Sequence, residues 1–297
     1  MTLAGVRPTV RVELEAAVTA LAAAGIETSR LDAEWLLSDL LGVGRFDLYL
    51  ALERELPGAL LSRYEAAIGR RIRREPLQQI LGWEAFRGLR LRVTGDVLVP
   101  RPETEVLAEW ALELLPPPAG RATRCARRPL VVDVGTGSGC VACALAHERP
   151  DIDVIALDAS PAAARVAQEN ARALGLADRL RVVAADLLAP VRGRGADLIV
   201  SNLPYLPTAL LPSLAPEVRD HEPPTALDGG VDGLVWIRRL VGGVPRALRP
   251  AGALVLETAG GPQATAVAEL LRGAAFVGVS VRRDLAGVAR FVAGRLP

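Results

Sequence analysis

Residues 131–139 have the sequence VVDVGTGSG, in which an apolar run passes directly into a glycine-rich turn. The run predicts a buried strand, and the residues that follow the turn have the apolar spacing of a helix. Glycines permit a tight turn and let a ligand approach the backbone, while the start of the helix offers free N–H donors. We expect a nucleotide-like ligand to bind at Gly135, Thr136, Gly137, Ser138 and Gly139.

Two kinds of cofactor fit this turn. It satisfies the dinucleotide pattern G-x-G-x-x-A, so a nicotinamide enzyme is one alternative. The turn begins directly after Asp133 and Val134, however, as in S-adenosylmethionine (SAM) methyltransferases, and this resemblance favours SAM. Asp158, which ends the next predicted strand, stands 19 residues after Gly139 and could bind the ribose hydroxyls of either cofactor. Capping of the helix that begins near Ser160 is the structural alternative for Asp158.

Asp186 follows a third apolar run, at residues 180–184. Its carboxylate could accept a hydrogen bond from the amino group of adenine. A solvated aspartate in a turn is the structural alternative.

A fourth apolar run, at residues 197–201, leads into the sequence Asn202-Leu203-Pro204-Tyr205. In a doubly wound sheet this strand lies beside the first, so Asn202 would face the glycine-rich turn across the topological switch point. A β-turn of the type Asn-x-Pro is the structural alternative.

The chemistry expected of this tetrapeptide follows from its acceptor atoms. An amide or exocyclic amino nitrogen is a poor nucleophile because its lone pair is delocalised. The side-chain oxygen of Asn202 and the main-chain carbonyl of Leu203 could accept both N–H bonds and direct the lone pair at a methyl group. Pro204 favours an extended Leu203, and Tyr205 offers a flat wall for a planar group.

The sequence pattern predicts that the whole chain divides into three regions. Residues 1–82 contain apolar residues at helical spacing, divided by Gly and Pro into about four helices. Residues 83–101 link the regions, and their alternating pattern on both sides of Thr94-Gly95-Asp96 predicts a β-hairpin. Residues 102–297 form an α/β domain with a doubly wound parallel sheet. Its predicted strands are 130–134, 153–157, 180–184, 197–201 and 253–257; its predicted helices are 103–115, 141–147, 161–174 and 234–248; residues 276–281 and 289–292 predict an antiparallel hairpin at one edge.

Composition narrows the function. All 35 basic residues are Arg, so Schiff-base lysines and P-loop lysines are excluded. The net charge of +1 creates no overall field that favours nucleic acid or an anionic membrane. No signal-peptide pattern or long apolar stretch occurs, and three cysteines fit a reducing compartment, so we expect a cytoplasmic protein without a membrane segment. Cys140, Cys143 and His147 share a helical face, but only Cys125 could complete a zinc site, so we expect core packing and no metal.

Several motifs together resemble those of the bacterial protein-glutamine methyltransferases that modify peptide chain release factors. They are residues 76–82 (PLQQILG), 99–105 (VPRPETE), 133–139, 202–205, 222–223 with 226–227, and 229–234 (GGVDGL). The resemblance implies a SAM-dependent, Rossmann-like enzyme that methylates the side-chain nitrogen of the glutamine in a Gly-Gly-Gln loop, with residues 1–82 docking the release factor. It implies that Asn202, Pro204 and Tyr205 are catalytic, that these and Leu203 bind substrate, and that Asp186, Leu187 and Asn202 contact the cofactor. The family usually has proline at the position of Leu203.

Two alternatives remain open at this stage. The first is another target. The sequence NLPY also resembles adenine dimethyltransferases of ribosomal RNA, so the target could be adenine in RNA; a glutamine of a ribosomal protein is another possible target. A catalytically silent paralogue that only binds its partner is the other alternative. RNA binding would require a clustered Arg face. The one local cluster, residues 70–74, better fits a solvated helix face or a protein-docking patch, so direct nucleic-acid binding is not expected.

Overall fold

The computed structural model describes residues 8–117, 127–193 and 195–297, and Cys125 therefore lies outside the described residues. The chain divides into two compact units. The helical unit comprises Met1–Gly82 and Pro216–His221, and the sheet unit comprises Trp83–Ala215 and Glu222–Pro297. No helix within the described ranges is both long enough and apolar enough to cross a membrane.

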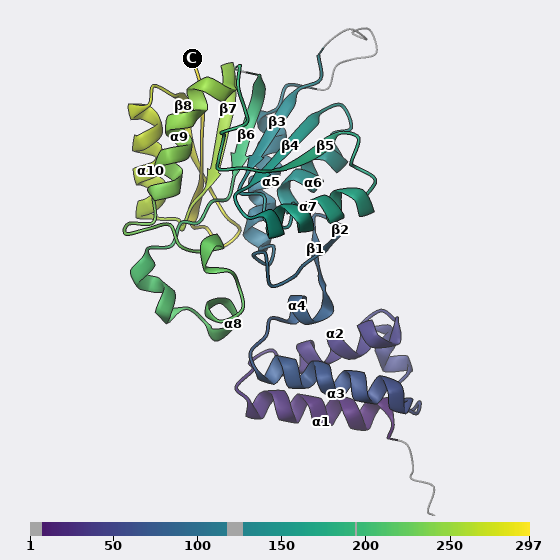
Figure 1. Cartoon of the computed structure of the whole chain (residues 1–297). Coiled ribbons are helices and arrows are strands. Elements are labelled where there is room, and N and C mark those ends of the chain that lie inside the picture. Colours follow the sequence, from purple (N-terminus) through teal and green to yellow (C-terminus); the bar gives the residue numbers. More distant parts are fainter. Residues whose placement is uncertain (1–7, 118–126, 194) are drawn as a thin grey trace, which may run out of the picture. The chain divides into compact units, whose positions relative to one another are not determined.

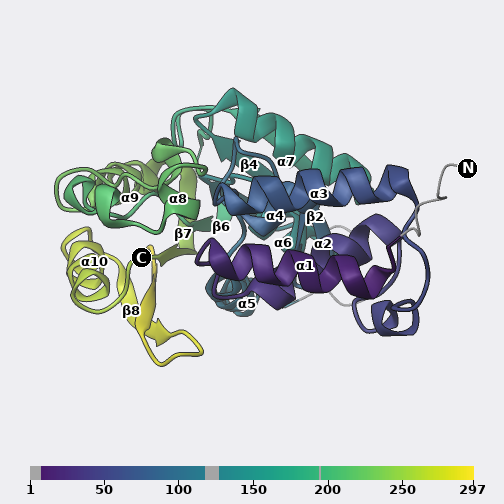
Figure 2. The same cartoon turned by 90° about the horizontal axis from the view of Figure 1, so that it is seen from below.

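The helical unit packs three main helices around one apolar core (Figure 2). Its elements are α1 (Val10–Ala23), α2 (Ser29–Leu41), the 3-10 turn η1 (Asp47–Leu50), α3 (Gly58–Ile72), α4 (Leu77–Leu81) and the short α8 (Pro216–Arg219). The hydroxyl oxygen of Thr9 accepts a hydrogen bond from the N–H of Val12 and caps α1. Gly42 ends α2 with a φ of 67°, a conformation that glycine adopts at little cost. Capping and apolar spacing thus account for these helices locally.

An ion-pair network ties the late segment Pro216–His221 into the helical unit. Arg71 is buried, and its Nε lies 2.7 Å from Oδ2 of Asp32, while its Nη1 lies 3.1 Å from Oε1 of Glu217. Nε of Arg74 lies 3.0 Å from the same Glu217 oxygen. Part of the basic cluster at residues 70–74 is therefore neutralised inside the unit.

The sheet unit contains a seven-stranded sheet in the order β5-β4-β3-β6-β7-β9-β8 (Figure 1). Strands β3 to β7 are parallel, and β9 and β8 complete one edge as an antiparallel hairpin. The first strand therefore lies beside the fourth, as predicted. The strands are β3 (Leu130–Val134), β4 (Asp153–Asp158), β5 (Leu180–Ala184), β6 (Ala196–Ser201), β7 (Leu248–Glu257), β8 (Val277–Arg283) and β9 (Ala289–Arg295).

Helices cover both faces of this sheet. The helices are α5 (Pro102–Leu114), α6 (Cys140–Glu148), α7 (Pro161–Ala173), α9 (Val235–Ala247) and α10 (Pro262–Gly273). Because successive strand side chains point to opposite faces, Val131 packs with α5 and α6, whereas Val132 packs with α9 and α10. The fold is thus the α/β, doubly wound, Rossmann-like sheet predicted from the sequence.

Two local predictions were wrong or incomplete. The hairpin of β1 (Trp83–Phe86) and β2 (Leu89–Arg92) turns at Arg87 and Gly88, not at residues 94–96. Both turn residues have positive φ, 47° and 77°, which a tight two-residue hairpin requires. Helix α10 was not predicted; its buried face consists of Ala264, Val267, Ala268 and Leu271.

Candidate active site

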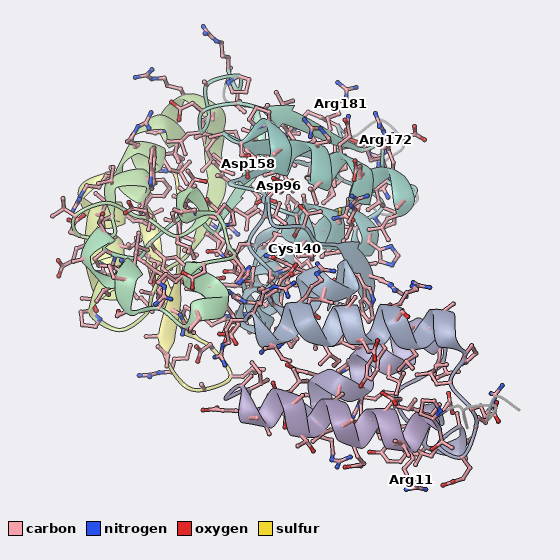
Figure 3. The ribbon with its side chains drawn as sticks, turned by 60° about the horizontal axis from the view of Figure 1, so that its bottom comes forward. Arg11, Asp96, Cys140, Asp158, Arg172 and Arg181 are labelled. Atoms are coloured by element: carbon pink, nitrogen blue, oxygen red, sulfur yellow. The ribbon has the colours of Figure 1, made fainter. Side chains whose placement is uncertain are left out.

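A cavity of about 400 Å³ lies at the carboxyl ends of the parallel strands of the sheet unit. The glycine-rich turn after β3, the end of β4 and the loop after β6 line it, together with parts of residues 96–104 and 223–226. Asp96, Cys140 and Asp158, all of which line the cavity, are labelled in Figure 3. This is the edge at which open α/β sheets bind their ligands.

Main-chain hydrogen bonds hold the glycine-rich turn. The N–H groups of Gly135 and Thr136 both donate to the carbonyl oxygen of Leu157, at 2.8 and 2.9 Å. Gly139 has a φ of 81°, and a Cβ there would lie 3.1 Å from Cβ of Ala167, so glycine lets α6 approach α7. Gly137, with a φ of 56°, has no heavy atom within 4 Å of the position of a Cβ. The turn is therefore held by β4 and has open space beside Gly137.

Asp133 supports the turn from beneath. Its Oδ2 accepts a hydrogen bond of 2.6 Å from the hydroxyl of Thr136, and 2% of its surface is exposed. Burial raises the pKa of this carboxyl group to about 7.

We expect the raised pKa of Asp133 to make stability depend on pH. The folded state holds this proton more tightly than the unfolded chain, so the free energy of unfolding falls as the pH rises from 3.8 to about 7. The loss amounts to up to about 4 kcal/mol. Asp133→Asn should remove this loss. The free energy of unfolding measured with urea should therefore rise for the variant relative to the parent between pH 5 and pH 8. An equal pH dependence in both proteins would refute this expectation.

Asp158 braces the turn from the neighbouring strand. Its Oδ2 accepts a hydrogen bond of 2.8 Å from the N–H of Gly137, and its Oδ1 accepts one of 2.9 Å from the N–H of Ser160. Burial raises the pKa of its carboxyl group. The hydroxyl of Ser160, not Asp158, caps α7 by accepting from the N–H of Ala163. The carboxylate of Asp158 therefore lies at the cavity with lone pairs available beyond these two bonds.

Asp186 and Leu187 line the cavity at the end of β5. Oδ2 of Asp186 accepts a hydrogen bond of 2.7 Å from Arg239, and the side chain is largely exposed. Leu187 has a positive φ of 46°. The carboxylate of Asp186 thus has one oxygen engaged with an arginine at the rim.

The loop after β6 brings Asn202, Leu203 and Pro204 to the cavity. Ser201 pairs with Val134 of β3, so Asn202 follows directly opposite the start of the glycine-rich turn. Leu203 is buried, and its Cδ2 would lie 2.9 Å from a Cβ on Gly135. Only glycine at position 135 admits this contact without rearrangement.

Tyr205, which is expected to offer a flat wall for a planar group, is held through its hydroxyl and its carbonyl. Its hydroxyl lies 3.3 Å from Oε1 of Glu257, and its carbonyl oxygen accepts a hydrogen bond of 2.9 Å from Nε2 of Gln263. Burial raises the pKa of the Tyr205 hydroxyl. The hydroxyl of Tyr205 is therefore held by the last residue of β7, and its carbonyl is held by α10.

Four polar residues near the cavity were not assigned a role from the sequence. Arg101 donates to both carboxylate oxygens of the buried Glu222, at 2.8 and 2.7 Å. Thr104 donates to Glu257, which is also buried. Arg101 and Thr104 lie within the motif at residues 99–105, so the sequence could have indicated a role for them. The sequence around Glu222 and Glu257 does not predict that Arg101 and Thr104 are their partners.

The two cysteines of α6 differ in burial: Cys140 is partly buried and lines the cavity, whereas Cys143 is buried. Cys143 is buried in the apolar core between α6 and the sheet, and burial raises the pKa of both Cys140 and Cys143. Across the described ranges, no three His, Cys, Asp or Glu side chains are grouped so as to hold a metal ion. The positions of these cysteines fit core packing.

The chain is similar to several known proteins over most of its length. Two family models match the chain, the PrmC N-terminal domain over residues 14–82 and the Methyltransferase small domain over residues 122–209. Proteins named release factor glutamine methyltransferase are 46% identical in Cereibacter sphaeroides, over 96% of this chain and 97% of the relative, and 42% identical in Geobacter sulfurreducens, over 93% of each. A third, from Moorella thermoacetica, is 46% identical over 94% of this chain and 95% of its own. The solved hMettl16 catalytic domain shares the fold, with a TM-score of 0.55 and 16% identity over 80% of this chain and 81% of that chain.

Proposed function

The chain belongs to the release factor glutamine methyltransferases, and we propose that its methyl transfer takes place in the cavity between the glycine-rich turn and the loop at Asn202. The enzyme transfers the methyl group of SAM to a glutamine of a release factor. The pairing of β3 with β6 supports the assignment of the site, because the glycine-rich turn and the loop at Asn202 follow these two adjacent strands and both line the cavity.

The residues of the glycine-rich turn fit SAM. Gly137 leaves open space where any other residue would place a Cβ, and Asp158 offers carboxylate oxygens to the ribose hydroxyls beside it. Asp186 and Leu187 would hold the adenine end. When bound, SAM supplies an electrophilic methyl group on a positively charged sulfur.

The loop residues hold the nucleophile. The Asn202 side-chain oxygen and the Leu203 carbonyl accept the two N–H bonds of the glutamine amide, which turns the nitrogen lone pair toward the methyl group. As the N–C bond forms, positive charge grows on the nitrogen, and the same two oxygens stabilise it. The bond between the methyl group and the sulfur of SAM would break in the same step, and the nitrogen then loses one proton to solvent water, which yields the methylated amide. Pro204 limits the conformations of Leu203 and keeps its carbonyl aimed.

The protein partner is a release factor, and the proposed target within it is the glutamine of the Gly-Gly-Gln loop. We assign docking of the folded release factor to the helical unit, since all the cofactor residues named above belong to the sheet unit. Release factors act in translation, so the proposed location is the cytoplasm. Direct binding of nucleic acid is not part of the proposal, because the net charge is +1 and Arg71 and Arg74 are engaged with carboxylates.

A labelling experiment tests this function. The purified enzyme is incubated with methyl-labelled SAM and, in separate reactions, with a release factor, with a release factor whose Gly-Gly-Gln glutamine is alanine, with ribosomal proteins and with ribosomal RNA. We expect label in the intact release factor alone. Label that persists in the alanine variant would refute the proposed target residue, and label in RNA would favour the adenine alternative.

A further inference from the structure

A chain of hydrogen bonds runs from Asn202 into the interior of the sheet unit. Nδ2 of Asn202 donates to Oγ1 of Thr104 at 3.2 Å, and that hydroxyl donates to Oε2 of Glu257 at 2.8 Å. The second Glu257 oxygen lies 3.3 Å from the Tyr205 hydroxyl. Three separate elements supply these groups: the loop after β6, helix α5 and the end of β7.

The direction of this chain follows from donor and acceptor chemistry. A carboxylate can only accept hydrogen bonds, whereas a threonine hydroxyl has a single proton to donate. Because the proton of Thr104 is directed to Glu257, the lone pairs of Thr104 are left to face Asn202. Only the NH₂ end of the Asn202 amide can then lie against Thr104, and its oxygen is turned to the other side.

We propose that Thr104 and Glu257 are positioning residues that determine which end of the Asn202 amide meets the substrate. The inference rests on the role proposed above for Asn202 as acceptor for the glutamine N–H groups. With the amide reversed, Asn202 would present two N–H donors to a substrate that also presents N–H donors. In this arrangement Glu257 acts on the substrate through Thr104 and Asn202, while its other oxygen accepts from the Tyr205 hydroxyl.

Burial supports a positioning role over a surface role. Thr104 and Glu257 are each 2% exposed. Burying a carboxylate costs free energy unless the group is hydrogen-bonded or paired with a charge. The neighbouring charged and titratable groups are Glu103 on α5, Cys140 on α6, Tyr205 in the loop and Arg290 on β9.

The same geometry makes the hydrogen-bond chain from Asn202 through Thr104 to Glu257 depend on pH. Burial raises the pKa of Glu257 to about 7, while Arg290 opposes this shift. Above that pH the carboxylate accepts from Thr104 and sets the direction described above. Below it, a protonated Glu257 can donate to Thr104, which frees the Thr104 hydroxyl to donate to the Asn202 oxygen. Methyl transfer should therefore increase as the pH rises through about 7.

Four variants of the full-length enzyme test the proposal. Thr104→Val removes the hydroxyl at nearly equal size, Thr104→Ser restores it, and Glu257→Gln removes the titration. Thr258→Val is the matched control, since Thr258 is also buried next to Glu257 but its hydroxyl donates to the carbonyl of Arg290. We measure kcat for release-factor methylation from pH 5.5 to 8.5, and the Kd of SAM by calorimetry.

We expect Thr104→Val to lower kcat at least 10-fold with the Kd of SAM changed less than 2-fold, whereas Thr104→Ser and Thr258→Val stay within about 3-fold of the parent. The rise in kcat near pH 7 should persist in Thr104→Ser and vanish in Glu257→Gln. If Asn202→Ala is inactive but Thr104→Val keeps the parental kcat, or if Glu257→Gln keeps the parental pH profile, the proposal is wrong. If Asn202→Ala itself stays active, the proposed role of Asn202 fails first. Should Thr104→Val not fold, the Glu257→Gln and Thr104→Ser profiles still decide the question.

Discussion

Asn202→Ala is expected to lower kcat for release-factor methylation at least 100-fold, which corresponds to about 3 kcal/mol of transition-state stabilisation. The alanine removes the side-chain oxygen that accepts one N–H of the substrate glutamine, so the nitrogen lone pair is no longer aimed. The loss should fall on kcat, because the interaction strengthens as positive charge develops on the nitrogen. The Thr104 hydroxyl, which Asn202 contacts at 3.2 Å, keeps its bond to Glu257, so the fold around the site should be retained.

Single-turnover transfer of labelled methyl groups measures this effect, because it separates the chemical step from product release. SAM binding by calorimetry is the control, and the Kd of Asn202→Ala should stay within a few-fold of the parent. Asn202→Asp makes a second comparison, since it keeps an acceptor oxygen but loses the NH₂ that contacts Thr104. Turnover close to the parental value in Asn202→Ala would remove this residue from the mechanism.

Asp158→Ala is expected to weaken SAM binding by roughly 5- to 150-fold, from the loss of hydrogen bonds worth about 1–3 kcal/mol. The carboxylate lies at the cavity end of β4, where it would bind the ribose. It also accepts the N–H of Gly137 at 2.8 Å, so alanine both removes a ligand group and loosens the turn. Asp158→Asn, which can still accept that N–H, should lose less.

Calorimetry with SAM and with NAD measures this prediction. Asp153 provides the matched control, since it begins the same strand, is about half exposed and pairs with Arg128. Asp153→Ala should bind SAM like the parent. Unchanged SAM binding in Asp158→Ala would overturn the cofactor assignment, and so would tight NAD binding by the parent.

The sequence by itself determined the class of the main sheet and the order of its strands along the chain. Apolar runs such as residues 130–134 and 196–201 are nearly fully buried, so their hydrophobicity alone predicts interior parallel strands. The glycine-rich turn was predicted for the same kind of reason, because three of its glycines adopt positive φ, which glycine adopts most readily. From the strand order, the meeting of Asn202 with this turn could also be predicted.

Only the tertiary structure decided how the polar groups around the cavity are connected. Thr104 and Glu257 are 153 residues apart in the chain, and Arg71 and Glu217 are 146 apart. Local periodicity contains no information on such pairs, because the partner of a buried carboxylate depends on which strand ends and helices the fold brings together. The true hairpin turn at Arg87 and Gly88 was missed for a related reason, since alternation continues past it and only strand pairing sets the register.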